Sequence, residues 1–250
     1  MCLVVPGLGR FVREHWKGLG SPLVARRVLA GTSSNVLRSQ PRGWPDKGDD
    51  MLTRQGCLGR QERFRSRLRE LRVDAAVIAD PRDVYYFTGA LPTSFPTLFY
   101  MGATGGSWLI SHTDEEEAAA DERHLYEYQK LFTMNPDPIA CLNRVVQDRV
   151  KGSGHIGVLG WQREALPRAV AQTLEEAFHP DSWVVVDGEL AAQQEVKDPD
   201  EVAVLRKAIA CSLAAYTAAA KAIRPGTSEL EVLEAAHRAA TLEAGEPVYH

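Results

Sequence analysis

Short apolar runs and stretches with helical spacing alternate along the chain from residue 61 onward. The apolar runs have the length of strands, and they predict strands at 74–79, 97–101, 107–111, 128–134, 155–160 and 183–187. The stretches between them predict helices at 61–71, 80–88, 114–125, 138–150 and 163–178. Helices that alternate with short strands are typical of an α/β fold, so residues 61–187 are expected to form a layered sheet with some hairpins.

The pattern changes after the last predicted strand, where only helices follow. Residues 199–223 have the spacing of one long amphipathic helix that begins with a proline. A Pro-Gly turn ends this helix. Ser228 and Glu231 then have the pattern of a capping box for a second helix to about Ala244, with Gly245 as its C-cap. Two helices without a sheet cannot bury their apolar faces well, so the second domain is expected to be incomplete.

The first fifty residues show neither a helical nor a strand period, and they end in a turn-forming segment at 45–50. Two interpretations stay open. The segment is either a disordered extension or upstream sequence translated from a start chosen too early. The expected organisation is an extension at 1–55, a sheet domain at 56–190 and the start of a second domain at 191–250.

The composition is that of an ordinary globular protein, with 44% hydrophobic residues, 25% charged residues and a net charge of −4. This mild charge, without a basic patch that contains aromatic residues, argues against nucleic-acid binding. No run approaches the roughly 18 apolar residues of a membrane span, and no signal peptide is predicted. The four cysteines are far apart in sequence, which fits a reducing compartment and argues against a disulfide framework or zinc knuckle. We therefore expect a cytoplasmic protein that does not bind membranes.

Three motifs carry a resemblance. A helix at 63–71 and a strand at 74–78 precede residues 83–89, D-V-Y-Y-F-T-G, which are similar to N-x-x-Y-x-T-G with Asp83 in place of Asn. Residues 197–208 are similar to K-x-P-x-E-[IV]-x-x-[LM]-R-x-A, and residues 223–229 to I-x-P-G-x-[TS]-E. Together these motifs resemble the creatinase/prolidase/aminopeptidase P family of metallopeptidases, of which this chain is expected to be an N-terminal fragment.

The resemblance implies a three-layer α/β N-terminal domain with a mixed sheet, followed by the first helices of a truncated pita-bread (α+β) domain. It also implies two divalent metals, manganese or cobalt, held in the full-length parent by two Asp, one His and two Glu of later strands. No position before His250 matches those ligands. We therefore assign no catalytic residue and no metal ligand in this chain, and the substrate-binding residues stay undetermined.

Three functions stay open for the parent protein. The first is a metal-dependent Xaa-Pro aminopeptidase or dipeptidase, of which this chain is expected to be a part that is inactive alone. The second is a non-catalytic pita-bread module that binds peptides or histones. The third is creatinase-like amidinohydrolase chemistry. For a peptidase, the resemblance implies proline-containing peptides as substrates and a homodimer as the assembly.

Other candidate sites have simpler structural interpretations. Residues 152–157 satisfy G-x-G-x-x-G, but they precede a predicted strand and do not open a helix, so we interpret them as a turn. His112 with Asp114 and Glu115 could bind a metal, yet a strand end and a helix start explain them as well. Three further histidines have no companion ligand at metal-binding spacing: His124, His155 and His179.

Cysteines and aromatic residues are interpreted mainly as core. Cys57, Cys141 and Cys211 are candidate nucleophiles only by residue type. In the family that this chain resembles, aromatic residues near the first motif can line the substrate cleft. The candidates here are Tyr85, Tyr86, Phe95, Phe99 and Tyr100. Glu231, Glu234 and His237 share one stripe of the second helix, which we interpret as a solvated face.

Overall fold

The computed structural model describes residues 51–90, 95–113, 117–127, 137–246 and 248 of the chain. These residues fall into two compact units, Met51–Val202 and the part that begins at Ala203. The expectation for residues 1–50 lies outside the described residues. Arg54 and Gln55, at the end of the expected extension, already belong to a helix.

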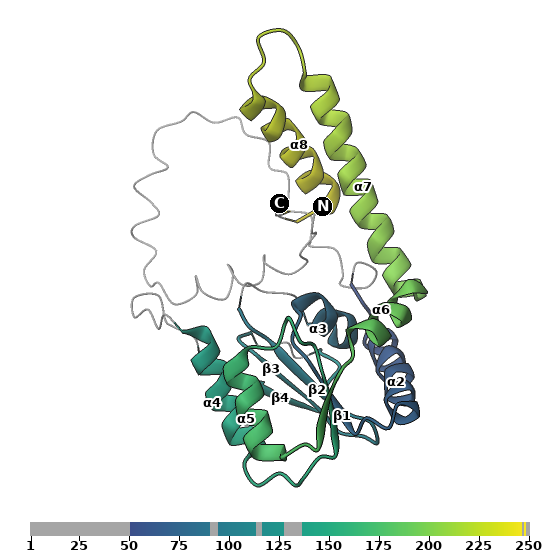
Figure 1. Ribbon diagram of the computed structural model, residues 1–250. Coiled ribbons are helices and arrows are strands. Elements are labelled where there is room, and N and C mark those ends of the chain that lie inside the picture. The colour runs from purple at the N-terminus through teal and green to yellow at the C-terminus, as the bar shows by residue number, and fades with distance from the viewer. Residues whose placement is uncertain (1–50, 91–94, 114–116, 128–136, 247, 249–250) are drawn as a thin grey trace, which may run out of the picture. The chain divides into compact units, whose positions relative to one another are not determined.

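The first unit contains a mixed six-stranded sheet with the strand order β4-β3-β2-β1-β5-β6 (Figure 1). Its strands are β1 (Ala75–Ile78), β2 (Leu98–Gly102), β3 (Ser107–Ser111), β4 (Glu122–Leu125), β5 (Val158–Trp161) and β6 (Ser182–Val185). Strand β1 pairs antiparallel with β2 and parallel with β5. The expected mixed sheet is therefore confirmed.

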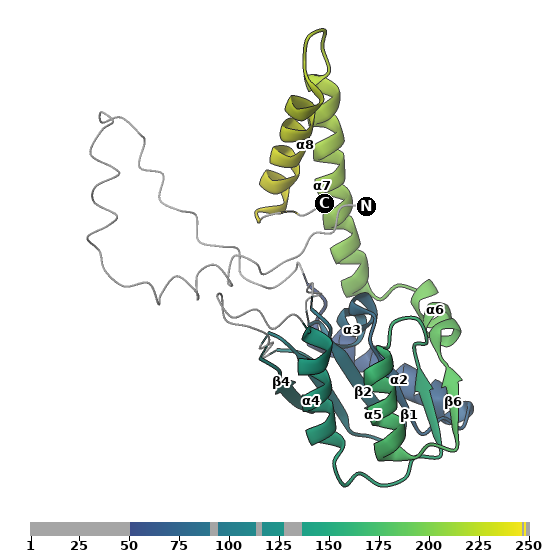
Figure 2. The same ribbon diagram turned by 60° about the vertical axis from the view of Figure 1, so that its left-hand side comes forward.

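Helices cover both faces of this sheet (Figures 1 and 2). The helices of the first unit are α2 (Arg54–Glu70), α3 (Pro81–Thr88), α4 (Pro138–Val150), α5 (Arg168–Phe178) and α6 (Asp187–Glu195). Apolar residues of α2, α3 and α6 pack on one face, and those of α4 and α5 on the other. Along β1, Ala76 and Ile78 point into the first core and Ala75 and Val77 into the second. The expected three-layer architecture is confirmed.

The local signals that start and end helix α3 behave as predicted. The Asp80 side chain caps the N-terminus by accepting a hydrogen bond from the Arg82 amide, and Pro81 occupies the first turn. Gly89 ends the helix with a φ of 72°, a left-handed conformation that glycine adopts without steric cost. Strand β1 therefore turns sharply into a helix that lies on the first face of the sheet.

The helix predicted at 114–125 is wrong. Residues 122–125 form strand β4, which pairs in parallel with β3, while residues 114–116 lie outside the described part. Strand β4 is an edge strand whose side chains are largely exposed, so its charged residues resemble those of a solvated helix. The strand predicted at 128–134 also lies outside the described residues.

Other helices differ from prediction in their limits. Helix α2 begins at Arg54 because Thr53 caps it, seven residues before the predicted start. Helix α5 begins at Arg168 after Pro167, later than the predicted residue 163. Helix α6 was not predicted, because it buries only Leu190 and has almost no apolar periodicity.

The second unit contains most of α7 (Pro199–Ala222) and α8 (Glu229–Ala244). Ser228 and Glu231 form the predicted capping box, and Gly245 is the predicted C-cap with a φ of 74°. The buried cluster between the two helices is small and consists of Cys211, Ala215, Ala240, Ala244 and Val248. Large apolar residues stay exposed, as expected for two helices without a sheet; they include Leu205, Ile209, Leu213, Tyr216 and Ile223.

Helix α7 is long and apolar enough to cross a membrane by length and composition. No membrane span was expected here, because Arg206 and Lys207 interrupt the apolar run. Length and composition alone do not distinguish a membrane span from a helix that packs against protein.

Candidate functional site at the start of helix α7

A fully buried arginine, Arg60, lies at the centre of a cluster of hydrogen bonds and ion pairs. The Arg60 side chain, on the buried face of α2, has no solvent exposure. Its Nε donates a hydrogen bond of 2.8 Å to the Tyr86 carbonyl oxygen, and its guanidinium lies 5.1 Å from the centre of the Tyr86 ring. A buried charge is costly unless it is paired, so the partners of Arg60 decide what this residue does.

Asp200, in the first turn of α7, is the main partner of Arg60. The guanidinium donates to both carboxylate oxygens, from Nη1 to Oδ1 at 2.9 Å and from Nη2 to Oδ2 at 3.2 Å. This two-pronged geometry is the strongest form of an Arg–carboxylate pair. Asp200 Oδ2 also accepts hydrogen bonds from the backbone amide and the hydroxyl of Thr53, at 2.9 and 3.2 Å. The residue that caps α2 thus binds the first turn of α7 as well.

Two further carboxylates complete the cluster. Asp198 Oδ2 accepts from Arg60 Nη1 at 3.2 Å and from Arg63 Nη2 at 2.6 Å. Glu201 Oε2 lies 3.9 Å from Arg60 Nη1 and accepts a hydrogen bond of 2.9 Å from the Asp198 amide. We call Arg60, Asp198, Asp200 and Glu201 the junction cluster. It ties the linker after α6 to α2.

The electrostatics of the Arg60–Asp200 pair favour its charged forms. Burial alone favours the neutral carboxylic acid of Asp200, but the hydrogen bonds from Arg60 and Thr53 outweigh it and lower the pKa of Asp200. Burial likewise opposes the charge of Arg60, yet the hydrogen bond to Asp200 keeps the pKa of Arg60 raised. Nearby, desolvation raises the pKa of the buried Cys57 thiol, whose Sγ lies 3.2 Å from Arg60 Nη2.

Asp83, the residue that replaces the Asn of the first motif, joins three elements. Its Oδ2 accepts from Gln162 Nε2 at 2.5 Å and its Oδ1 from Gln194 Nε2 at 2.8 Å. Gln162 Oε1 in turn accepts from the amides of Ala79 and Asp80 at the end of β1. Burial raises the pKa of Asp83, although both amides favour its carboxylate. The end of α6 is thus tied to α3.

The other sequence-predicted candidates that lie among the described residues do not come together in one site. Gly152 lies in a turn after α4 with a φ of 75°, as expected, and the loop precedes β5. His112 packs against Phe95 and Tyr126 at ring distances of 4.6 and 5.8 Å. Its proposed companions Asp114 and Glu115 lie outside the described residues.

Histidines at two other positions do have carboxylate neighbours, which sequence spacing did not indicate. His124 Nε2 lies 3.3 Å from Glu122 Oε2, and His155 Nε2 lies 3.4 Å from Asp181 Oδ2. Each is a pair and not a group of three ligands. His179 is the C-cap of α5 with a φ of 44°.

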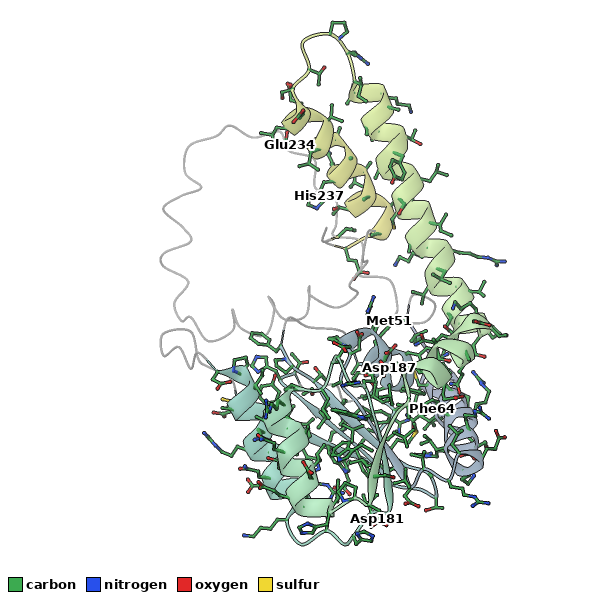
Figure 3. The ribbon with its side chains drawn as sticks, viewed as in Figure 1. Met51, Phe64, Asp181, Asp187, Glu234 and His237 are labelled. Atoms are coloured by element: carbon green, nitrogen blue, oxygen red, sulfur yellow. The ribbon has the colours of Figure 1, made fainter. Side chains whose placement is uncertain are left out.

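The three described cysteines, Cys57, Cys141 and Cys211, are buried, as expected of core residues. The aromatic candidates lie mostly in or beside the cores. Phe99 packs near Phe87 at 6.1 Å, and Tyr100 stacks on Trp108 at 4.9 Å. On α8, Glu231, Glu234 and His237 are all exposed, and Figure 3 labels the last two. The interpretation of this stripe as a solvated face agrees with their exposure.

The described residues do not fit the two metals that the resemblance implies. No group of three or more His, Cys, Asp or Glu side chains among them could hold an ion. We therefore derive no catalytic step through a metal from this chain.

Sequence reasoning missed Arg60 and its partners. A signal was present, because Arg60 is spaced by four residues from Phe64 and by eight from Leu68, both fully buried. A charged residue on the apolar stripe of a helix indicates a buried ion pair. The partner could not be found in the same way, since Asp200 is 140 residues away in sequence.

Comparison with known proteins now identifies the fold. The family model of the creatinase/prolidase N-terminal domain matches residues 60–222. The chain belongs to this family. The match includes Arg60, Asp83 and all three carboxylates of the junction cluster, and it continues through α7.

Solved structures agree with this assignment of the fold. The prolidase from Pyrococcus horikoshii OT3 is 19% identical with a TM-score of 0.55, over 74% of this chain and 48% of that one. The Xaa-Pro dipeptidase from Bacillus anthracis is 19% identical with a TM-score of 0.55, over 75% and 49%. The X-Pro aminopeptidase from Thermotoga maritima MSB8 is 21% identical with a TM-score of 0.53, over 73% and 49%.

The chain spans about half the length of these three structures. Comparison with curated proteins finds no match. The comparisons therefore show the family and the fold of the N-terminal domain, and the activity of the whole protein is a separate question.

Proposed function

We propose that this chain supplies the N-terminal domain of a metal-dependent hydrolase that acts on Xaa-Pro peptides. The observation that carries the proposal is the family match over residues 60–222, which runs from α2 across the linker to the end of α7. Similar solved structures are a prolidase, an Xaa-Pro dipeptidase and an X-Pro aminopeptidase, which supports the substrate class. A homodimer and a cytoplasmic location belong to the same proposal.

In this proposal the chain has a structural role and does not hydrolyse peptides by itself. A two-metal hydrolase needs carboxylates that hold two ions about 3.5–4 Å apart. The carboxylates of the junction cluster instead form ion pairs with Arg60 and Arg63. The implied metals, manganese or cobalt, are therefore assigned to residues other than those described here.

The first test is the coding sequence that follows the codon for His250. The proposal predicts a series of Asp, Asp, His, Glu and Glu codons on strands of a pita-bread domain. A continuation that has such strands but lacks this series would instead favour the peptide- or histone-binding module. A continuation of another fold would contradict both.

The second test is enzymatic. Purified chain 1–250 is expected to release no proline from an Ala-Pro dipeptide with added Mn²⁺, and calorimetric titration with Mn²⁺ is expected to show no tight site. The longer reading frame is expected to hydrolyse the same dipeptide under the same conditions. Hydrolysis by chain 1–250, together with two stoichiometric Mn²⁺ sites, would contradict the structural role.

A further inference from the structure

The linker and first turn of α7 are attached to the sheet domain by polar contacts and by almost no apolar ones. Val196 is 78% exposed, and no residue from 196 to 202 belongs to a buried apolar cluster. The contacts that hold this segment are the ion pairs of Asp198, Asp200 and Glu201 with Arg60, the hydrogen bonds of Asp200 with Thr53, and an exposed ion pair of Asp198 with Arg63. Loss of the ion pairs therefore leaves little to hold it.

The sheet domain also depends on this segment, because the segment supplies the charge partners of Arg60. All ion pairs of Arg60 among the described residues reach Asp198, Asp200 and Glu201. Without them, a guanidinium with no solvent exposure keeps only the Tyr86 carbonyl, the Cys57 sulfur and the Tyr86 ring as partners. An unpaired buried charge is strongly destabilising, so α2 and α3 need this segment in place.

We propose that Arg60 is a latch that makes residues 198–202 part of the N-terminal domain, so that the boundary between the two folding units lies inside α7. The motif that resembles the start of the catalytic domain then folds with the sheet. Gln193 extends the latch, because its Nε2 donates to the Arg60 carbonyl oxygen at 3.1 Å and to the Tyr86 hydroxyl at 3.2 Å. The latch is independent of whether the whole protein is a peptidase.

Hydrogen exchange of the full chain, followed by mass spectrometry of peptides, tests the latch. The variants are Arg60→Gln, which removes the positive charge on α2, and Asp200→Asn, which removes a negative charge on α7. The matched control is Arg63→Gln, since Arg63 also pairs with Asp198 but is 49% exposed. Within residues 198–202 the amides of Asp198, Glu201 and Val202 donate hydrogen bonds inside the segment. In both latch variants, these three amides are expected to exchange about 100-fold faster.

Amides of β1 and β2 are expected to accelerate at least about 10-fold less than those of the segment, because these strands are also held by the apolar cores. The control is expected to change the exchange of 198–202 by no more than about 5-fold, as an exposed ion pair does. The double variant is expected to exchange no faster than the faster single one, because both substitutions break the same pair.

Two results would overturn the latch. Wild-type exchange of residues 198–202 in both variants would show that other contacts hold the segment. An equal acceleration in β1, β2 and 198–202 would show that Arg60 stabilises the whole domain without a local role. If Arg60→Gln does not fold, Asp200→Asn alone decides between these results and the expected one.

Discussion

The two units of this chain contain similar helices but are held together differently. In the first unit, Phe64 and Phe87 lie fully buried between helices and a sheet. In the second, Ile209 and Tyr216 are 64% and 76% exposed, and the helices touch through small residues such as Ala215 and Ala240. Apolar spacing therefore shows which residues share a helix face, whereas burial depends on whether another layer covers that face.

Substitution of large apolar residues should reveal the greatest difference between the units. Phe87→Ala removes a ring that packs against Phe64, Tyr86 and Phe99. We expect it to lower the free energy of unfolding of the first unit by about 3–5 kcal/mol. Ile209→Ala, the control in α7, should change stability by less than about 0.5 kcal/mol. Urea unfolding measures both effects: tryptophan fluorescence reports on the first unit, which contains Trp108, Trp161 and Trp183, and circular dichroism reports on the helices of the second unit. Equal effects would mean that another layer covers α7.

Substitutions at two glycines of α2 test how closely this helix packs against the junction cluster. A Cβ at Gly56 would lie 2.2 Å from Asp200 Oδ2, whereas the nearest atom to a Cβ at Gly59 is 3.8 Å away. Gly56→Ala should therefore destabilise the first unit by about 1–3 kcal/mol, through forced displacement of Asp200. Gly59→Ala should be neutral or stabilise it by up to about 1 kcal/mol, since alanine favours a helix. Thermal unfolding distinguishes the pair, and a stable Gly56→Ala variant would contradict the tight approach.

Much of the sheet domain could be predicted from sequence, because its signals are local. Asp80, Pro81 and Gly89 set the limits of α3, and the apolar run at 74–79 gave β1. Strand β4 could not be found, since its membership of the sheet comes from backbone pairing with β3 and not from its own side chains. The junction cluster was missed for a related reason: its partners meet only after the fold brings α2 and the linker together.

The capping box of α8 offers a smaller effect in the second unit. Ser228 Oγ accepts a hydrogen bond from the Glu231 amide, and Glu231 Oε2 accepts one from the Ser228 amide. Ser228→Ala should destabilise α8 by about 1 kcal/mol. Because this helix has few buried contacts, the loss should appear as lower helicity by circular dichroism, with the unfolding midpoint of the first unit unchanged. A shifted midpoint would contradict the separation of the two units.

The smallest predicted effect is a pH dependence at Asp83. Its folded-state pKa is raised by burial, so ionisation destabilises the folded state, and this destabilisation grows as pH rises above the unfolded value of about 3.9. Asp83→Asn should therefore gain stability relative to the wild type between about pH 4 and neutral pH, by up to about 1 kcal/mol. Urea midpoints at several pH values measure the difference. A difference that does not change with pH would contradict the raised pKa.

The central claim is that the chain folds as two units of unequal stability, with the boundary inside α7 at Val202. Hydrogen exchange of the unmodified full chain tests it directly. We predict slow exchange in the strands β1 to β3 and in helices α2 and α3 of the first unit and at the Val202 amide. Exchange should be at least about 100-fold faster in the rest of α7 and in α8, because few buried contacts protect them. Uniform protection along α7, or a step before Asp198, would contradict the account.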